Sequence, residues 1–154
     1  MDKELAVQSL TDTMAKFTAY IGKRLPKDVK SKLIELKTLE TNPLAKSIYD
    51  SMDENQEAAD RLNRPSCQDT GVIQYFVEAG AHFPLLGELQ EILREATEEA
   101  TRTGPLRHNA VETFDEKNTG TNTGTQIPWL DWRIVPEQDT CTIDVYMAGG
   151  GCTL

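Results

Sequence analysis

The spacing of apolar residues changes about one third of the way along the chain, and this change most constrains the fold. Over residues 2–22, apolar side chains recur every three or four positions, which predicts an amphipathic helix ending near Gly22. A second helix is expected to begin at Pro26, and a third at Asn42 as N-cap with Pro43 in the first turn, running to about residue 62. The expected buried sides comprise Val7, Leu10, Met14, Phe17 and Ile21 in the first helix and Val29, Leu33 and Leu36 in the second.

Short β-branched and aromatic runs then replace this helical spacing. Residues 72–78 lie between two glycines and predict a strand. Two further strands are expected at 127–135 and 141–148, joined through PEQDT as a half-buried hairpin. In the last strand, alternate residues from Cys141 onward are apolar, so Cys141 should face the core.

A helix and a long loop separate these strands. After Pro84, an apolar stripe that begins at Leu85 predicts a helix to about residue 102. Residues 104–126 are rich in Gly, Asn and Thr and have no sustained period, which favours a long and often functional loop. The sequence therefore predicts one α+β domain over residues 1–154: a helical N-terminal third, then a small, mainly antiparallel sheet with a packed helix and a long functional loop.

Charge and hydropathy exclude several classes of function. The net charge is −9 and no concentrated basic face is visible, so a nucleic-acid partner is not expected. There is no apolar run of membrane-spanning length and no signal peptide, which predicts a cytoplasmic protein without a membrane association. An anionic ligand would need local basic groups. The candidates, which flank the polar motifs, are Arg64, Arg102, Arg107 and His108.

The motif RPSCQDTG places Cys67, Gln68 and Asp69 side by side just before the first expected strand. Cys67 could be a small buried side chain or a chemically active thiol, and its polar neighbours leave both interpretations open. Asp69 could form a turn, because Asp-Thr-Gly is typical turn sequence, or act as a general acid or base. A redox-active thiol is a weaker alternative, because a neighbouring carboxylate disfavours the thiolate.

The other candidates lie further along the chain. Arg107 could be an ordinary surface side chain or could bind a carboxylate through its planar guanidinium. Cys152 follows a run of three glycines whose amides could bind an anion. A site that combines Cys67, Cys141 and Cys152 would contradict the strand pattern around Cys141.

Three motifs together resemble a known family. CQDTG at 67–71, PLRHNAVETFDEKNTGTNTG at 105–124 and YMAGGGCTL at 146–154 are similar to iron-sulfur hydro-lyases, namely class I fumarases and L(+)-tartrate dehydratases. The similarity is greatest to the alpha subunit of the two-subunit enzymes. It implies reversible dehydration of a small hydroxy-dicarboxylic acid, with a 4Fe-4S cluster held by three cysteines whose fourth iron binds substrate oxygen.

The resemblance also implies roles for particular residues. Cys67 resembles the first cluster ligand, Gln68 and Asp69 resemble residues that contact substrate, and Asp69 is a candidate for proton transfer. Arg107 resembles the arginine that binds a substrate carboxylate, and the glycine run that includes Gly149 and Gly150 resembles a stretch that approaches substrate.

In the family, the other two cluster cysteines lie further along the chain than position 154, so the sequence is expected to be the N-terminal part of a longer alpha subunit. A beta subunit or C-terminal domain would complete the site within a hetero- or homo-oligomer, and the segment alone is expected to be inactive. The alternative is a cluster-free module that only docks to a partner subunit.

Overall fold

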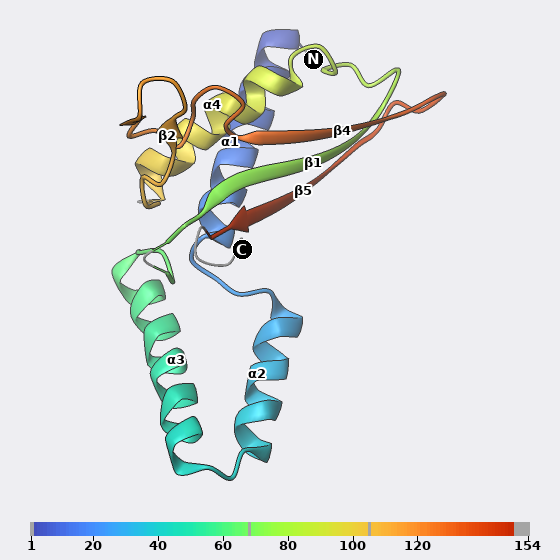
Figure 1. Cartoon of the computed structure of the whole chain (residues 1–154). Helices are drawn as coiled ribbons and strands as arrows, with labels where there is room; N and C mark the ends of the chain where they lie inside the picture. Colours follow the sequence, from blue (N-terminus) through green and yellow to red (C-terminus); the bar gives the residue numbers. More distant parts are fainter. Residues whose placement is uncertain (1, 68, 105, 150–154) are drawn as a thin grey trace.

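The computed structural model describes residues 2–67, 69–104 and 106–149 and contains helices and strands in the order expected (Figure 1). The N-terminal helices are α1 (Lys3–Ile21), α2 (Lys27–Leu39) and α3 (Pro43–Leu62). They are followed by β1 (Val72–Gly80), α4 (Leu89–Thr103), β2 (Val111–Glu112), β3 (Lys117–Asn118), β4 (Trp129–Val135) and β5 (Cys141–Ala148). The α+β class and the helical N-terminal third are confirmed.

The larger sheet has the strand order β4-β1-β5, with β1 parallel to β4 and antiparallel to β5. The prediction that β4 and β5 form a hairpin is therefore wrong, because β1 lies between them. Burial explains this order: every inward-facing side chain of β1 is at most 2% exposed, whereas most residues of β4 and β5 are exposed or half-buried. The strand with the most apolar inward face takes the centre, where it is covered most completely.

The core lies between one face of this sheet and the helices α1 and α4 (Figure 1). It is formed mainly by Met14, Ala15 and Ala19 of α1, Ile73, Tyr75, Val77 and Ala79 of β1, and Leu89, Leu93, Ala96 and Ala100 of α4. The prediction that Phe17 is buried is wrong, because this residue is 44% exposed. α4 begins at Leu89 and not near Leu85, since residues 84–88 form turns closed by bonds such as Glu88 N to Leu85 O, 3.0 Å.

A buried chain of hydroxyl groups links the central strand to both helices that cover it. The phenol oxygen of Tyr75 on β1 lies 3.0 Å from the hydroxyl of Thr18 on α1 and 3.0 Å from that of Thr97 on α4. Burial raises the pKa of Tyr75, so the neutral phenol is retained and can exchange hydrogen bonds with both threonines. Hydrogen bonds between buried polar groups, such as these, fix how α1 and α4 pack on β1.

α2 and α3 form a helical hairpin that projects away from the sheet and diverges from the loop that joins the two helices (Figure 1). The caps are as expected, since Asn42 accepts a 2.9 Å hydrogen bond from the Leu44 amide and Pro43 follows it in the first turn. The expected buried side of α2 is wrong: no residue of α2 is buried, and Val29 and Leu36 are both exposed. Among the described helices, none has a stretch both long and apolar enough to cross a membrane.

Candidate functional site

The turn that leads into β1 is built around Asp69. Its carboxylate accepts a 2.8 Å hydrogen bond from the Gly71 amide, which is the turn geometry that Asp-Thr-Gly favours. Gly71 has φ +79°, and a Cβ there would lie 2.3 Å from the carbonyl of Ala148. A glycine is therefore required, and it lets the end of β5 pass directly beside Asp69.

Asp69 lies where three segments meet. The side-chain amide of Asn109 donates a hydrogen bond to the Asp69 carboxylate. On the other side, a Cβ added to Gly149 would lie 3.4 Å from Asp69 Oδ2, so the backbone after β5 is in van der Waals reach of the carboxylate. Asp69 and Gly149, both singled out by the sequence, are thus brought together by the pairing of β1 with β5.

The backbone that carries Arg107 is fixed next to this turn. The Arg107 amide donates a 2.8 Å hydrogen bond to the hydroxyl of Thr70, the residue after Asp69. Buried Asn122 accepts from the Asn109 amide at 2.8 Å and donates to the Arg107 carbonyl at 2.8 Å. The position of residues 107–110 is consequently determined by the fold, while the Arg107 side chain remains exposed.

A pocket of about 1210 Å³ opens beside these residues. Its walls are Arg64, Pro65, Glu98, Thr101, Arg102, Leu106, Arg107, His108, Asn109, Gly120 and Thr121. Arg102 is bound to Glu99 at 2.7 Å, but within the described residues neither Arg64 nor Arg107 forms an ion pair. The pocket therefore offers two guanidinium groups to an anion in a chain whose net charge is −9.

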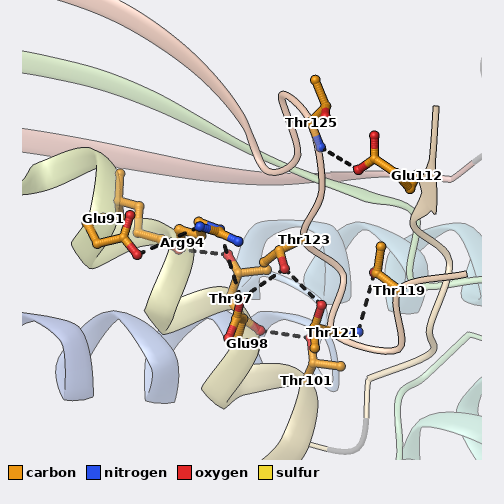
Figure 2. Close-up of polar contacts among 11 residues, drawn as sticks. Glu91, Arg94, Thr97, Glu98, Thr101, Glu112, Thr119, Thr121, Thr123 and Thr125 are labelled. Atoms are coloured by element: carbon orange, nitrogen blue, oxygen red, sulfur yellow. Dashed lines mark hydrogen bonds and ion pairs between the residues drawn. The ribbon is translucent and has the colours of Figure 1, made fainter. Parts of the chain in front are cut away.

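A network of threonines anchors the far wall of the pocket to α4 (Figure 2). The hydroxyls of Thr121 and Thr123 lie 2.8 Å apart, and Thr123 donates to Glu98 of α4 at 3.0 Å. Glu112 accepts a 2.8 Å hydrogen bond from the Thr125 amide, and these bonds hold the pKa of Glu112 below its ordinary value. The sequence predicts a loop here. The structure shows a loop held by many polar contacts, and its regular secondary structure, among the described residues, is limited to the short β2–β3 ribbon.

Asn122 and Asn109 are the residues that sequence reasoning missed. Asn122 adopts φ +59°, a left-handed conformation that asparagine tolerates better than most residues. By itself, the repeated Asn-Thr-Gly pattern indicates only turns. The position of Asn122 among threonines is the one available signal, and nothing in the pattern indicates that its amide reaches back to residues 107–110.

The cysteines do not come together in the described part of the chain. Cys67 is exposed and its sulfur accepts a hydrogen bond from the Asp69 amide at 3.5 Å. Cys141 pairs with Ala79 at the other end of β1, roughly 25 Å from the Asp69 turn at the rise of a strand. Burial raises the pKa of the Cys141 thiol, and this residue lies against the core as the strand pattern predicted.

The structure describes Cys67, Asp69, Arg107 and Gly149 but not all of the candidates. Gln68, Gly150 and Cys152 lie outside the described residues. Within the described residues, no group of three or more His, Cys, Asp or Glu side chains is arranged to hold a metal ion. Of the two described thiols, Cys67 is the one that contacts the Asp69 turn and could serve as a ligand to a metal centre shared with other residues.

Comparison with known proteins assigns the chain to a class. The chain belongs to the fumarate hydratase family, because the family model described as fumarate hydratase (Fumerase) matches residues 11–154. It is 58% identical, over 153 residues, to the L(+)-tartrate dehydratase subunit alpha of Escherichia coli strain K12 and to the protein of the same name from Shigella sonnei. These matches cover 99% of the chain and 50% of each relative, so the chain spans about half their length. The resemblance seen in the three motifs is confirmed.

Proposed function

We propose that the chain forms part of the alpha subunit of an iron-sulfur hydro-lyase that reversibly dehydrates a small hydroxy-dicarboxylic acid. L-tartrate, converted to oxaloacetate, is the favoured substrate because of the 58% identity to tartrate dehydratase subunits; malate, converted to fumarate, is the second candidate. The observation that carries the proposal is the meeting of Asp69 and Gly149 with the segment of Arg107 and Asn109, which lines the pocket.

Arg107 binds one carboxylate of the substrate in this proposal. Its guanidinium lines the pocket without an ion-pair partner in the described residues, and it can form two parallel hydrogen bonds with a carboxylate. The backbone bonds from Thr70 and Asn122 keep the residue from shifting when substrate binds. Gln68 and the glycine run at Gly149 and Gly150 contact the same substrate, as the family resemblance implies.

Asp69 takes or gives the proton in this proposal. The Gly71 amide and the Asn109 side chain both bind Oδ1, while Oδ2 lies on the side of Gly149. The bonds to Oδ1 thus help to orient the carboxyl group. Its side toward Gly149 faces the segment that the resemblance places next to substrate, where a proton carrier is needed.

The cofactor proposal concerns Cys67. An exposed thiol next to Asp69 is compatible with binding one iron of a 4Fe-4S cluster, while Cys141 is not, because it is distant and its thiol stays protonated. The other ligands would come from residues beyond those described, and a beta subunit or further domain would complete the site. When bound, the cluster supplies a Lewis acid for the substrate hydroxyl.

The pocket itself is larger than a four-carbon diacid requires. At about 1210 Å³ it exceeds the ~300–1,000 Å³ of pockets that enclose drug-sized ligands. A site that must exclude water needs further walls. This supports the proposal that a partner subunit or domain closes over Arg107 and Asp69, and that the chain alone is inactive.

The test is anaerobic assembly of the complete alpha subunit with its beta subunit, assayed with L-tartrate and malate. Arg107→Lys should lower kcat/KM by roughly a hundredfold through loss of the bidentate bond, and Cys67→Ala should abolish turnover. Arg133→Lys, at an exposed arginine on β4 paired with Glu78, is the matched control and should have no effect. No turnover of either acid, or turnover unchanged by Cys67→Ala, would overturn the proposal. An iron-free, colourless complete complex would favour the docking-module alternative.

A further inference from the structure

Asn109 contacts both parts of the candidate site. Its Nδ2 atom donates a hydrogen bond to the Asp69 carboxylate, and the same residue lines the pocket together with Arg107. It lies two positions after Arg107, on a segment whose backbone is held by Thr70 and Asn122. The proposed function gives roles to Asp69 and Arg107, but the part of Asn109 that does not bind Asp69 has none.

The position of the Asn109 side chain is fixed by its backbone as well as by Asp69. The Asn109 amide donates to Oδ1 of Asn122 at 2.8 Å and to the Arg107 carbonyl at 3.1 Å. The next residue, Ala110, is buried, and its amide donates to the same Oδ1 at 3.2 Å. Because backbone and side chain are both held, binding a ligand costs Asn109 little further rotamer entropy.

Part of the hydrogen-bonding capacity of Asn109 is unused. A primary amide has two N–H donors and one oxygen that accepts. One N–H is taken by Asp69, and among the described residues neither the other N–H nor Oδ1 has a hydrogen-bond partner. The bond to Asp69 also assigns the orientation of the amide, because the reverse orientation would place Oδ1 against a carboxylate. A donor and an acceptor together suit a hydroxyl group, which does both, better than a carboxylate, which only accepts.

The chemistry of tartrate places such a hydroxyl beside the proton that is removed. In the proposed dehydration, one carbon loses its hydroxyl group as hydroxide, and the neighbouring carbon loses its C–H proton to Asp69. The C–H electron pair becomes the double bond, and the hydroxide and the proton together make up one water. In L-tartrate the carbon that gives up the proton carries the second hydroxyl, which stays in the enol and becomes the keto group of oxaloacetate. In malate this carbon is a CH2 group.

We propose that Asn109 binds the hydroxyl on the carbon that is deprotonated, and thereby makes the site prefer L-tartrate, or a similar dihydroxy diacid, over malate. The hydroxyl and the removed hydrogen are on the same carbon, so a group in contact with Asp69 is within reach of both. Oδ1 of Asn109 accepts a hydrogen bond from this hydroxyl. With malate, the same oxygen faces a CH2 group and has no partner, which slows the reaction of that acid. This inference rests on the proposed function.

The test compares the two acids on one enzyme. The complete alpha subunit is assembled anaerobically with its beta subunit, and kcat/KM is measured for L-tartrate and for malate. The ratio of the two values is the readout, because a residue that only orients Asp69 affects both acids equally, whereas a residue that binds the second hydroxyl affects them differently. Asn109→Ala should lower the ratio of tartrate to malate about tenfold.

Asn118→Ala is the matched control. Asn118 also donates a side-chain hydrogen bond to this segment, at the His108 carbonyl. Within the described part of the chain, it has no hydrogen bond to Asp69 and does not line the pocket. Its replacement should change kcat/KM for both acids by the same factor and leave the ratio unchanged. A fall in the ratio as large as that in Asn109→Ala would overturn the inference.

A binding measurement covers the case in which Asn109→Ala converts neither acid. Asp69→Asn removes the proton carrier but keeps an oxygen that can accept from Asn109, so that each acid can be titrated by calorimetry without turnover. Adding Asn109→Ala to this variant of the assembled enzyme should raise the Kd of L-tartrate about tenfold relative to the Kd of malate. Equal changes for the two acids would overturn the inference.

Failure of the inference is distinguishable from failure of the proposed function. An active wild type whose ratio is unchanged by Asn109→Ala would overturn the inference alone, and so would a wild type that prefers malate. A wild type that converts neither acid would overturn the proposed function, and the inference with it.

Discussion

Asn122 donates a hydrogen bond from Nδ2 to the backbone oxygen of Arg107, 2.8 Å away, and so connects the long threonine-rich loop to the segment that carries the guanidinium. The same side chain accepts from the Asn109 amide through Oδ1. One buried side-chain amide therefore fixes the backbone on both sides of His108, although Asn122 itself does not line the pocket.

Replacing Asn122 should loosen the Arg107 segment. Asn122→Leu leaves the Asn109 amide and the Arg107 carbonyl without partners, at a cost of about 2 to 3 kcal/mol. Hydrogen exchange of the Asn109 and Ala110 amides should accelerate by a factor of ten or more at about that cost. Exchange as slow as in the wild type would show that Asn122 does not hold this segment.

Gly71→Ala should destabilise the end of the sheet at which β1 begins and β5 ends. The residue has φ +79°, and the added methyl would lie 2.3 Å from the Ala148 carbonyl, so β1 and β5 must separate locally. We expect a loss of about 2 kcal/mol or more in urea unfolding. Gly87→Ala is the matched control, because no atom lies within 4 Å of its added Cβ, and its free energy of unfolding should be unchanged or slightly higher.

Tyr75→Phe should weaken the contact between the sheet and both helices. The substitution removes hydrogen bonds to Thr18 and Thr97 while keeping the ring. A cost of about 1 to 2 kcal/mol in the free energy of unfolding is expected for the lost buried bonds. Tyr146→Phe, at a position 57% exposed, should be nearly neutral in the same urea titration. Equal costs would mean that the buried hydroxyl adds nothing.

The described thiols should differ in reactivity. Cys67 is exposed, whereas burial raises the pKa of Cys141 and keeps its thiol protonated at neutral pH. Iodoacetamide should therefore alkylate Cys67 first, as followed by mass spectrometry of the two peptides. Faster modification of Cys141 would contradict the burial of its strand against the core.

The loop anchored by Glu112 should open on acidification. Hydrogen bonds from the Thr125 and Thr113 amides favour the carboxylate and lower its pKa, so their stabilising effect is complete above the unfolded value of about 4.3 and is lost as pH falls through the folded value. The NMR shift of the Thr125 amide should titrate with a midpoint below about 4.3. Glu112→Gln should abolish this titration, and a midpoint at or above the ordinary value would refute the assignment.

Local sequence signals predict the elements well but not how they pair. Asn42 and Pro43 begin α3 and Gly22 caps α1, because capping depends on residues a few positions apart. The predicted pairing of β4 with β5 is wrong, although two strands joined by a short linker are typical of a hairpin. Only the burial of Tyr75 and its neighbours on β1, a property of the assembled core, shows that β1 must lie between them.

The candidate site could be predicted to the same extent. The sequence singled out Asp69, Gly149 and Arg107, and the structure places Asp69 next to Gly149 and Arg107 in the wall of the pocket, while their roles stay predictions. The supports at Asn109 and Asn122 could not be predicted, because each acts through a contact far along the sequence. Helix α2 shows the same limit, since its apolar spacing predicts burial but cannot indicate what covers it.

The central position of β1 also has a consequence for biosynthesis. Its partners β4 and β5 are both synthesised after the pocket segment and the threonine-rich loop. Gln74 therefore has no strand partner until Trp129 and Tyr146 have been synthesised. During translation, the helices and one unpaired apolar strand are exposed first, a state prone to aggregation. Formation of the sheet is therefore a late event in the production of this chain.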